Sequence, residues 1–147
     1  MRSLTFLALL GLVLPLVAED PKKPADLELL QGEWVLVGLE VREQTVPAEK
    51  LAGTTLVIKK DKYTTIVKKK EYAATFTVDQ KQDPKHIDML IPDDSGTPKL
   101  SKGIYKIDGD KLIICRGQVP GGERPRNFVS SATNDVFVVT WERNSKP

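Results

Sequence analysis

Hydrophobic and polar residues alternate along most of the chain after residue 34, with the period of two that is typical of β-strands. The clearest case is residues 71–79 (EYAATFTVD), where every second residue is apolar. Residues 86–92 repeat the pattern, with Ile87, Met89 and Ile91 on one face. This period predicts strands that have one buried face and one face in water.

Short polar turns separate the other strand-like segments, and the clearest turn is Gly109-Asp110. A further turn is expected at Asp61-Lys62, between two apolar-rich runs. About eight strands with short connections predict an all-β fold, an antiparallel up-and-down β-barrel, because closure removes the exposed edges of a sheet. The other strands are expected near residues 35–41, 55–60, 63–69, 103–108, 111–117 and 136–143.

Two of these strands are apolar on both faces, at residues 112–114 and 136–139. Because a barrel wall normally shows water one face, another part of the protein must cover the outer positions. The leucine-rich segment 25–31, which is expected to form one or two helical turns, is the candidate cover. A protein partner on this surface is the alternative.

The interior of a small barrel is either filled by its own side chains or holds one small ligand. The side chains that we expect to face inward, and to line a ligand site if there is one, are Val37, Phe76, Met89 and Tyr105. Binding of a small apolar ligand is therefore the preferred interpretation. A structural or protein-interaction module without a ligand is the alternative.

The loop GGERPRNF at residues 121–128 is the candidate gate of such a site, because Arg124 and Arg126 flank a stiff proline. Arginine forks suit carboxylate or phosphate recognition. The interpretation that we prefer, however, is that these arginines anchor the loop to acidic residues such as Asp88 or Asp108 on neighbouring strands.

The N-terminal residues 1–18 have a basic start, an apolar run and a final alanine, the layout of a secretory signal peptide. The alternative is an uncleaved anchor, although Pro15 interrupts a run that is short for a membrane span. We expect an exported protein, periplasmic or extracellular, without a membrane span once the signal is removed. The expected organisation is a linker at 19–26, a barrel domain at 27–143 and a tail at 144–147.

The charge balance argues against nucleic acid as a partner. Removal of Arg2 with the signal leaves 21 of the 22 basic residues against 20 acidic ones, a net charge of +1. A chain this close to neutrality has little non-specific attraction for nucleic acid or anionic membranes.

Cys115 and His86 are the residues that an enzyme would use, in a hydrolase with a thiolate nucleophile and an imidazole base. Neighbouring residues of a strand point to opposite faces, so Arg116 should point away from Cys115 and fail to activate it. We therefore interpret Cys115 as a packed strand residue. One cysteine and one histidine leave no basis for a zinc site or an internal disulfide, and we expect no metal and no cofactor.

Gly32-Glu33-Trp34, directly before the first strand, resembles the G-x-W motif that opens lipocalin-type barrels. Over residues 28–143 the chain also resembles an uncharacterised domain family of secreted planctomycete proteins. The resemblance rests on five motifs that occur here in the order of that family: ELLQGEWVLVGLE, KHIDML, GIYKIDGDKLIICR, GGERP and the terminal ER. The resemblance implies a lipocalin-like barrel and no particular activity. It also implies that Trp34 plugs one end of the barrel under Arg143, although Arg143 could instead stack on Trp141.

Overall fold

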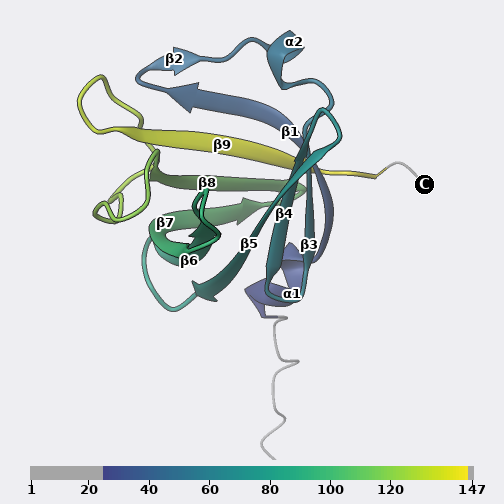
Figure 1. Ribbon diagram of the computed structural model, residues 1–147, viewed down its shortest axis with the longest axis horizontal. Coiled ribbons are helices and arrows are strands. Elements are labelled where there is room, and N and C mark those ends of the chain that lie inside the picture. The colour runs from purple at the N-terminus through teal and green to yellow at the C-terminus, as the bar shows by residue number, and fades with distance from the viewer. Residues whose placement is uncertain (1–24, 146–147) are drawn as a thin grey trace, which may run out of the picture.

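The structure, a computed structural model, describes residues 25–145, which form a closed antiparallel β-barrel (Figure 1). Eight strands pair in an up-and-down order, and the last of them pairs back with the first. This confirms the fold class predicted from the alternating pattern. The strands are β1 (Gly32–Val41), β2 (Gln44–Thr45), β3 (Thr55–Lys59), β4 (Lys62–Val67), β5 (Lys70–Asp79), β6 (Lys85–Pro92), β7 (Pro98–Asp108), β8 (Lys111–Gly117) and β9 (Val136–Arg143).

Two short helices lie at opposite ends of the barrel (Figure 1). Helix α1 (Asp26–Leu30) precedes β1, and helix α2 (Ala48–Leu51) lies in the connection from β1 to β3. The two-residue strand β2 pairs only with β1 and stands outside the closed barrel. The end that carries α1 is called the closed end below, and the end that carries α2 is called the open end.

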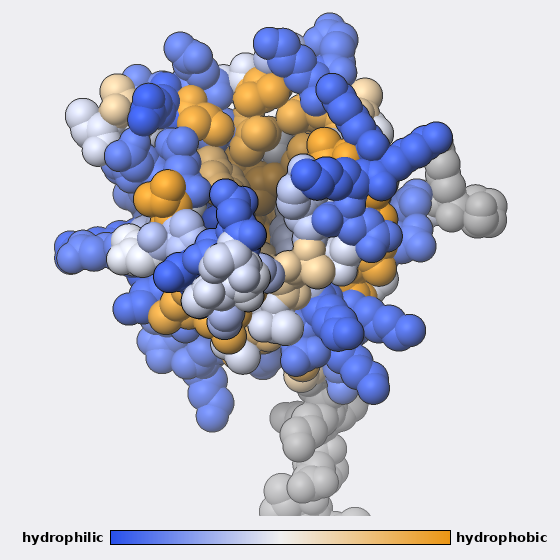
Figure 2. All heavy atoms as spheres, in the orientation of Figure 1, coloured by the Kyte–Doolittle hydropathy of each residue, from blue (hydrophilic) through white to orange (hydrophobic). Residues whose placement is uncertain are grey.

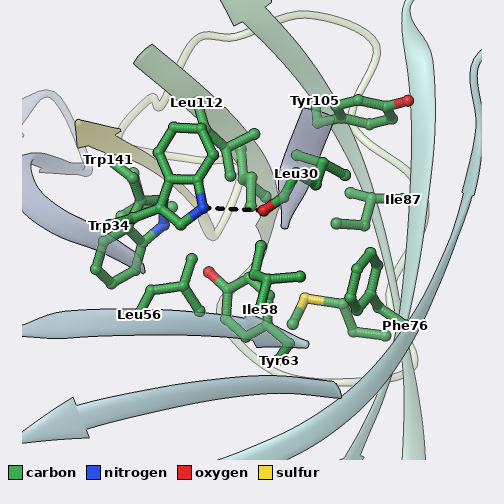
Figure 3. Close-up of a cluster of buried hydrophobic side chains, with 13 residues drawn as sticks. Leu30, Trp34, Leu56, Ile58, Tyr63, Phe76, Ile87, Tyr105, Leu112 and Trp141 are labelled. Atoms are coloured by element: carbon green, nitrogen blue, oxygen red, sulfur yellow. Dashed lines mark hydrogen bonds between the residues drawn. The ribbon is translucent and has the colours of Figure 1, made fainter. Parts of the chain in front are cut away.

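Helix α1 fills the closed end because Leu30 inserts completely into the core (Figure 3). The Trp34 indole Nε1 donates a hydrogen bond to the Leu30 carbonyl at 3.0 Å, so the buried ring has its polar atom satisfied. The Arg143 guanidinium lies over the Trp34 ring, 4.1 Å from its centre. The expected contact between the first and last strands is therefore present, with Trp34 and not Trp141 under the cation.

A buried polar contact fixes α1 to the barrel wall. Asp26 is only 5% exposed, and its Oδ2 accepts hydrogen bonds from the Tyr105 hydroxyl at 2.8 Å and from Lys85 Nζ at 2.6 Å. The Gln80 side chain accepts a hydrogen bond from the Asp26 backbone N–H. Asp26, the last residue of the expected linker, thus belongs to α1, whereas the expected signal peptide lies outside the described residues.

Strand β1 contains a β-bulge between Leu36 and Gly38, which shifts its register against β9. The bulge reverses the alternation, so that Leu36 and Leu39 both face inward while Val37 lies outside and is 44% exposed. The prediction that Val37 faces the interior is therefore wrong. The strict alternation seen in the sequence does not reveal the extra residue.

Several hairpin turns contain residues with left-handed backbones. The Gly109-Asp110 connection between β7 and β8 is the predicted one, and Gly109 has a φ of 58°. Arg42 and Glu43 form the β1–β2 turn with φ values of 49° and 64°, and Lys68-Lys69 form the β4–β5 turn with 49° and 69°. None of these four positions is a glycine, so the sequence gives no turn signal there, and the strand predicted over residues 63–69 extended through Lys68-Lys69 for this reason.

A long loop, residues 118–135, covers the outer face of β7, β8 and β9. Phe128 packs on a cluster formed by Ile104, Cys115 and Val136, with Val138 beside it. The leucine-rich segment was expected to cover this face, but its Leu30 enters the barrel instead. That expectation is wrong, because Leu30 of α1 is part of the packed core at the closed end of the barrel, and Phe128 covers the outer positions instead.

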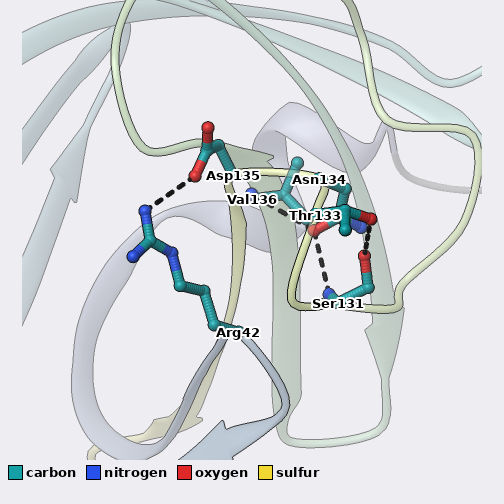
Figure 4. A network of polar contacts seen from close by, with 6 residues as sticks. All are labelled: Arg42, Ser131, Thr133, Asn134, Asp135 and Val136. Carbon is teal, nitrogen blue, oxygen red and sulfur yellow. Dashed lines mark hydrogen bonds and ion pairs between the residues drawn. The ribbon is translucent and has the colours of Figure 1, made fainter.

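Polar contacts hold this loop in place (Figure 4). Arg42 in the first hairpin forms an ion pair with Asp135 at 2.9 Å. Asn134 Oδ1 accepts hydrogen bonds from the backbone N–H groups of Ser131 and Val136. The buried Ser130 hydroxyl donates to Glu40 and accepts from the Glu43 N–H. The loop therefore enters β9 with its backbone groups satisfied.

Candidate ligand-binding cavity

The two halves of the barrel differ in how they are filled. The closed half is packed with side chains, which include Trp34, Phe76, Met89 and Tyr105 (Figure 3). The open half contains a cavity of about 540 Å³, which lies within the usual size range of small-molecule sites. Figure 2 shows a hollow walled by apolar side chains and bordered by hydrophilic ones.

Strands from both sides of the barrel contribute to the cavity wall. Most of its side chains are aliphatic or aromatic, as expected where strands direct alternate residues inward. The apolar lining residues are Leu36, Leu39, Val41, Val46, Leu51, Val67, Ile114, Phe137, Val139 and Trp141. The polar ones are Lys50, Thr54, Tyr63, Thr65, Arg116 and Gln118.

Four of these side chains separate the cavity from the packed half, because they belong both to the cavity wall and to the core cluster. They are Tyr63, Ile114, Val139 and Trp141. Tyr63 is held from below by an edge-to-face contact with the Phe76 ring, at 6.2 Å and 76°. These four residues form a firm floor, and the cavity is not continuous with the packed region around Tyr105.

Arg116 is the main charged group in the cavity wall. It follows Leu112 and Ile114 on the inner face of β8, and its guanidinium stacks on the Phe137 ring of β9 at 4.5 Å. Its Nη1 donates long hydrogen bonds to the Gly117 carbonyl at 3.3 Å and to the Ser101 hydroxyl at 3.5 Å. Among residues 25–145, no Asp or Glu forms an ion pair with Arg116.

Small residues on β7 provide the space for Arg116. Gly103 is the register partner of Arg116, and a Cβ there would lie 3.0 Å from the Arg116 Cβ and 2.9 Å from the Cys115 carbonyl oxygen. Ser101, two positions earlier, is also buried. A larger side chain at position 103 would push the arginine out of its present position.

Tyr63 and Trp141 add two polar groups to the cavity floor. Burial raises the pKa of Tyr63 well above its ordinary value, although the nearby Arg116 charge and the Trp141 indole oppose this rise. Burial also holds the pKa of Arg116 below its ordinary value. The Trp141 Nε1–H lies near Tyr63, but it has no acceptor in good hydrogen-bond geometry and is buried.

The mouth of the cavity is formed by the segment between β1 and β3. Helix α2 contributes Lys50 and Leu51, and Val46 is held to β1 by a backbone hydrogen bond to the Leu39 carbonyl at 2.8 Å. Gln118 lies at the start of the loop on the opposite side. The lining contains two basic side chains and no acidic one, so the cavity carries a net positive charge.

The residues predicted to line a ligand site lie elsewhere. Phe76, Met89 and Tyr105 face inward, as predicted, but all three belong to the packed closed half. Val37 lies outside the barrel. A ligand role for these four residues has no support in the cavity lining, because the bulge and the filled closed half move the open space toward α2.

The loop arginines lie on the outer face and not at the cavity. Arg124 forms an ion pair with Asp88 at 2.7 Å and donates a hydrogen bond to the Gly103 carbonyl at 2.7 Å. The contacts preferred for it from the sequence, which anchor the loop to a neighbouring strand, are thus observed. Arg126 is exposed. The structure therefore gives no support to the hypothesis that this loop gates a ligand site.

Cys115 and His86 are not brought together for catalysis. Ile104 is the register partner of both residues, so it lies between them on the outer face. Cys115 is fully buried, and burial raises its pKa to about 11, with a smaller effect from Glu40. A thiol in this environment is a poor nucleophile, which agrees with its interpretation as a packed strand residue.

The acidic turn at residues 93–97 is explained by its own hydrogen bonds. Asp93 accepts hydrogen bonds from the Ser95 hydroxyl and from the backbone N–H groups of Thr97 and Ser95, and these contacts, the hydroxyl first, hold the pKa of Asp93 below its ordinary value. Within residues 25–145, no cluster of three or more His, Cys, Asp or Glu residues is arranged to hold a metal ion.

Comparison of the chain with known protein families, with curated proteins and with solved structures found no match. Among the described residues, neither helix has the length and apolar character needed to cross a bilayer.

Sequence reasoning missed Arg116 as a site residue, although the signal was present. Arg116 lies an even number of residues from Leu112 and Ile114 along the strand, so it shares their inward-facing side, whereas Cys115 lies on the other side. A charged residue in register with an apolar inner face is unusual, because a buried charge is costly unless it has a partner. The position of Arg116 in this alternation would have predicted that its side chain faces the interior of the barrel.

Proposed function

We propose that this protein is an exported barrel that binds one small, largely apolar ligand in the cavity at its open end. The observation that carries the proposal is the contrast between the two halves of the barrel, one packed and one hollow. A fold that needed only a stable core would gain by filling the cavity, because unfilled apolar space reduces stability. The apolar wall and the open mouth suit a ligand that enters from solvent.

The N-terminal sequence supports export, since residues 1–18 have the layout of a signal peptide. The contact between Trp34 and Arg143 supports a lipocalin-like barrel, as does the resemblance to the planctomycete family. A protein partner is less well supported by the structure than by the sequence, because Phe128 covers the outer apolar face on which a partner was expected.

Titration with a neutral apolar probe tests this function. Dodecanol, added below its aggregation concentration, should bind at one site and change the emission of Trp141, which lines the cavity. Thr65→Phe places a large ring in the cavity and should weaken binding at least tenfold. Thr64→Phe is the matched control, because the neighbouring residue of β4 points to the outer face.

The result that would overturn the proposal is equally clear. If the wild-type protein binds no dodecanol, or if Thr65→Phe and Thr64→Phe bind it equally well, the cavity is not the binding site. Circular dichroism of both variants ensures that each has kept the β-fold.

A further inference from the structure

We propose that the ligand carries a single carboxylate, and that this group binds the guanidinium of Arg116 while the apolar part of the ligand extends toward the mouth. The inference rests on the proposed function, since it names the chemistry of the ligand that the same cavity takes. It depends on three features of the described residues: an unpaired cation, an unused donor and a lining without acids.

The first feature is the lack of a counter-charge for Arg116. Two other arginines that pack against the barrel are compensated: Arg124 of the outer loop has Asp88, and Arg143 has two carbonyls and the Trp34 ring. Arg116 has only two long hydrogen bonds and a stack on Phe137. A desolvated guanidinium with several free N–H donors is suited to a planar carboxylate, which accepts two of them in parallel.

The second feature is the donor set around that guanidinium. The Trp141 Nε1–H is buried without an acceptor, and an unsatisfied buried donor of this kind carries a free-energy cost. The Tyr63 hydroxyl lies in the same floor, close enough for Arg116 to affect its pKa. An anionic oxygen placed here could accept a hydrogen bond from the Trp141 Nε1–H, which has no acceptor in good geometry, together with bonds from the Arg116 guanidinium and the Tyr63 hydroxyl beside it.

The third feature is the charge of the lining. Arg116 and Lys50 are its charged residues, and no acid lines the cavity to repel an anion. The rest of the wall is apolar, so a ligand charged along its whole length would leave most of that wall unused. One carboxylate on an aliphatic or aromatic body matches both parts of the lining.

The test compares two probes of the same chain length, dodecanoate and dodecanol, by calorimetry at pH 8 and below their aggregation concentrations. The wild-type protein should bind dodecanoate about 10- to 100-fold more tightly than dodecanol, the range expected for a hydrogen-bonded charged group. Arg116→Met should remove this preference, so that the variant binds the two probes with similar affinities; a variant that keeps the full preference would overturn the inference. Arg42→Met is the control, because it removes an exposed arginine outside the cavity and should change neither affinity.

Two further results keep the inference falsifiable if Arg116→Met does not fold. Tyr63→Phe removes one hydroxyl and should reduce the ratio of dodecanoate to dodecanol affinity several-fold. The preference of the wild-type protein should also fall as salt is raised. Equal affinities of the wild type for both probes would overturn the carboxylate and leave the apolar site standing, whereas no binding of either probe would overturn both.

Discussion

The guanidinium of Arg143 lies 4.1 Å from the centre of the Trp34 ring, and its two terminal nitrogens donate hydrogen bonds to the carbonyls of Leu29 and Gln31. One side chain of the last strand thus joins the first strand and satisfies the C-terminal end of α1. The two ends of the described chain are held together by this contact, and the closed end of the barrel depends on it.

Trp34→Ala should lower the free energy of unfolding by about 3–5 kcal/mol, because it leaves a large cavity in the core. Arg143→Met should cost about 1–3 kcal/mol, since the two carbonyls lose their donor. In a double-mutant cycle measured by urea unfolding, the two changes should be coupled by at least about 0.5 kcal/mol. Strict additivity would show that the stacking does not contribute.

Asp26→Ala should lower the free energy of unfolding by about 1–3 kcal/mol, because the buried Tyr105 hydroxyl and Lys85 lose their common acceptor. Glu28→Ala is the matched control, since it removes an exposed carboxylate from the same helix and should change little. Urea unfolding of the two variants measures the difference. Equal effects would contradict the role of Asp26 in holding α1 to the barrel.

Gly103→Ala should destabilise the protein by about 1–3 kcal/mol, because the added methyl group meets the Cys115 carbonyl and the Arg116 Cβ. It should also displace Arg116 and so weaken dodecanoate binding. Gly122→Ala, where no atom lies within 4 Å of the added Cβ, is the control and should be close to neutral. A neutral Gly103→Ala would mean that β7 and β8 can separate without cost.

Cys115 should make the protein less stable at alkaline pH. Burial raises its pKa from 9.0 to about 11, so the folded state holds the thiol proton more tightly than the unfolded state does. This contribution to stability is complete below pH 9 and is lost as the pH rises toward 11. Thermal unfolding across this interval should therefore show a smaller decrease for Cys115→Ala than for the wild type.

Labelling of Cys115 by a thiol reagent at pH 8 should be slow in the folded protein, because the thiol is fully buried under Phe128. Phe128→Ala should speed the reaction by uncovering it, whereas the labelling rate in denaturant should be the same for both proteins. Rapid labelling of the folded wild type would contradict the covering role of the loop.

The strands were predictable where apolar and polar residues alternate without interruption. Residues 71–79 and 86–92 show this, and their inner residues Phe76 and Met89 are buried as expected. The fold class follows from these strands and from the short connections between them. Trp34 and Arg143 were also predictable, because closure of a meander places the first and last strands side by side.

The remaining features depend on tertiary structure. The bulge beside Val37 is fixed by the pairing of β1 with β9. The two-residue turns formed by lysine, arginine and glutamate contain no glycine, so the sequence does not indicate them. The sequence also does not determine which half of a barrel is filled, because Leu30 enters from outside the sheet. The inward-facing residues predicted to line a ligand site therefore lie in the packed half of the barrel, and Arg116, which lines the cavity, was not predicted as a site residue.

A crystal structure of the protein with dodecanoate tests the central claim most directly. We expect electron density for the chain inside the open half of the barrel, against Leu39 and Val139, with the carboxylate within about 3 Å of the Arg116 guanidinium. An empty cavity at saturating dodecanoate, or a ligand bound only on the outside of the barrel, would contradict the account.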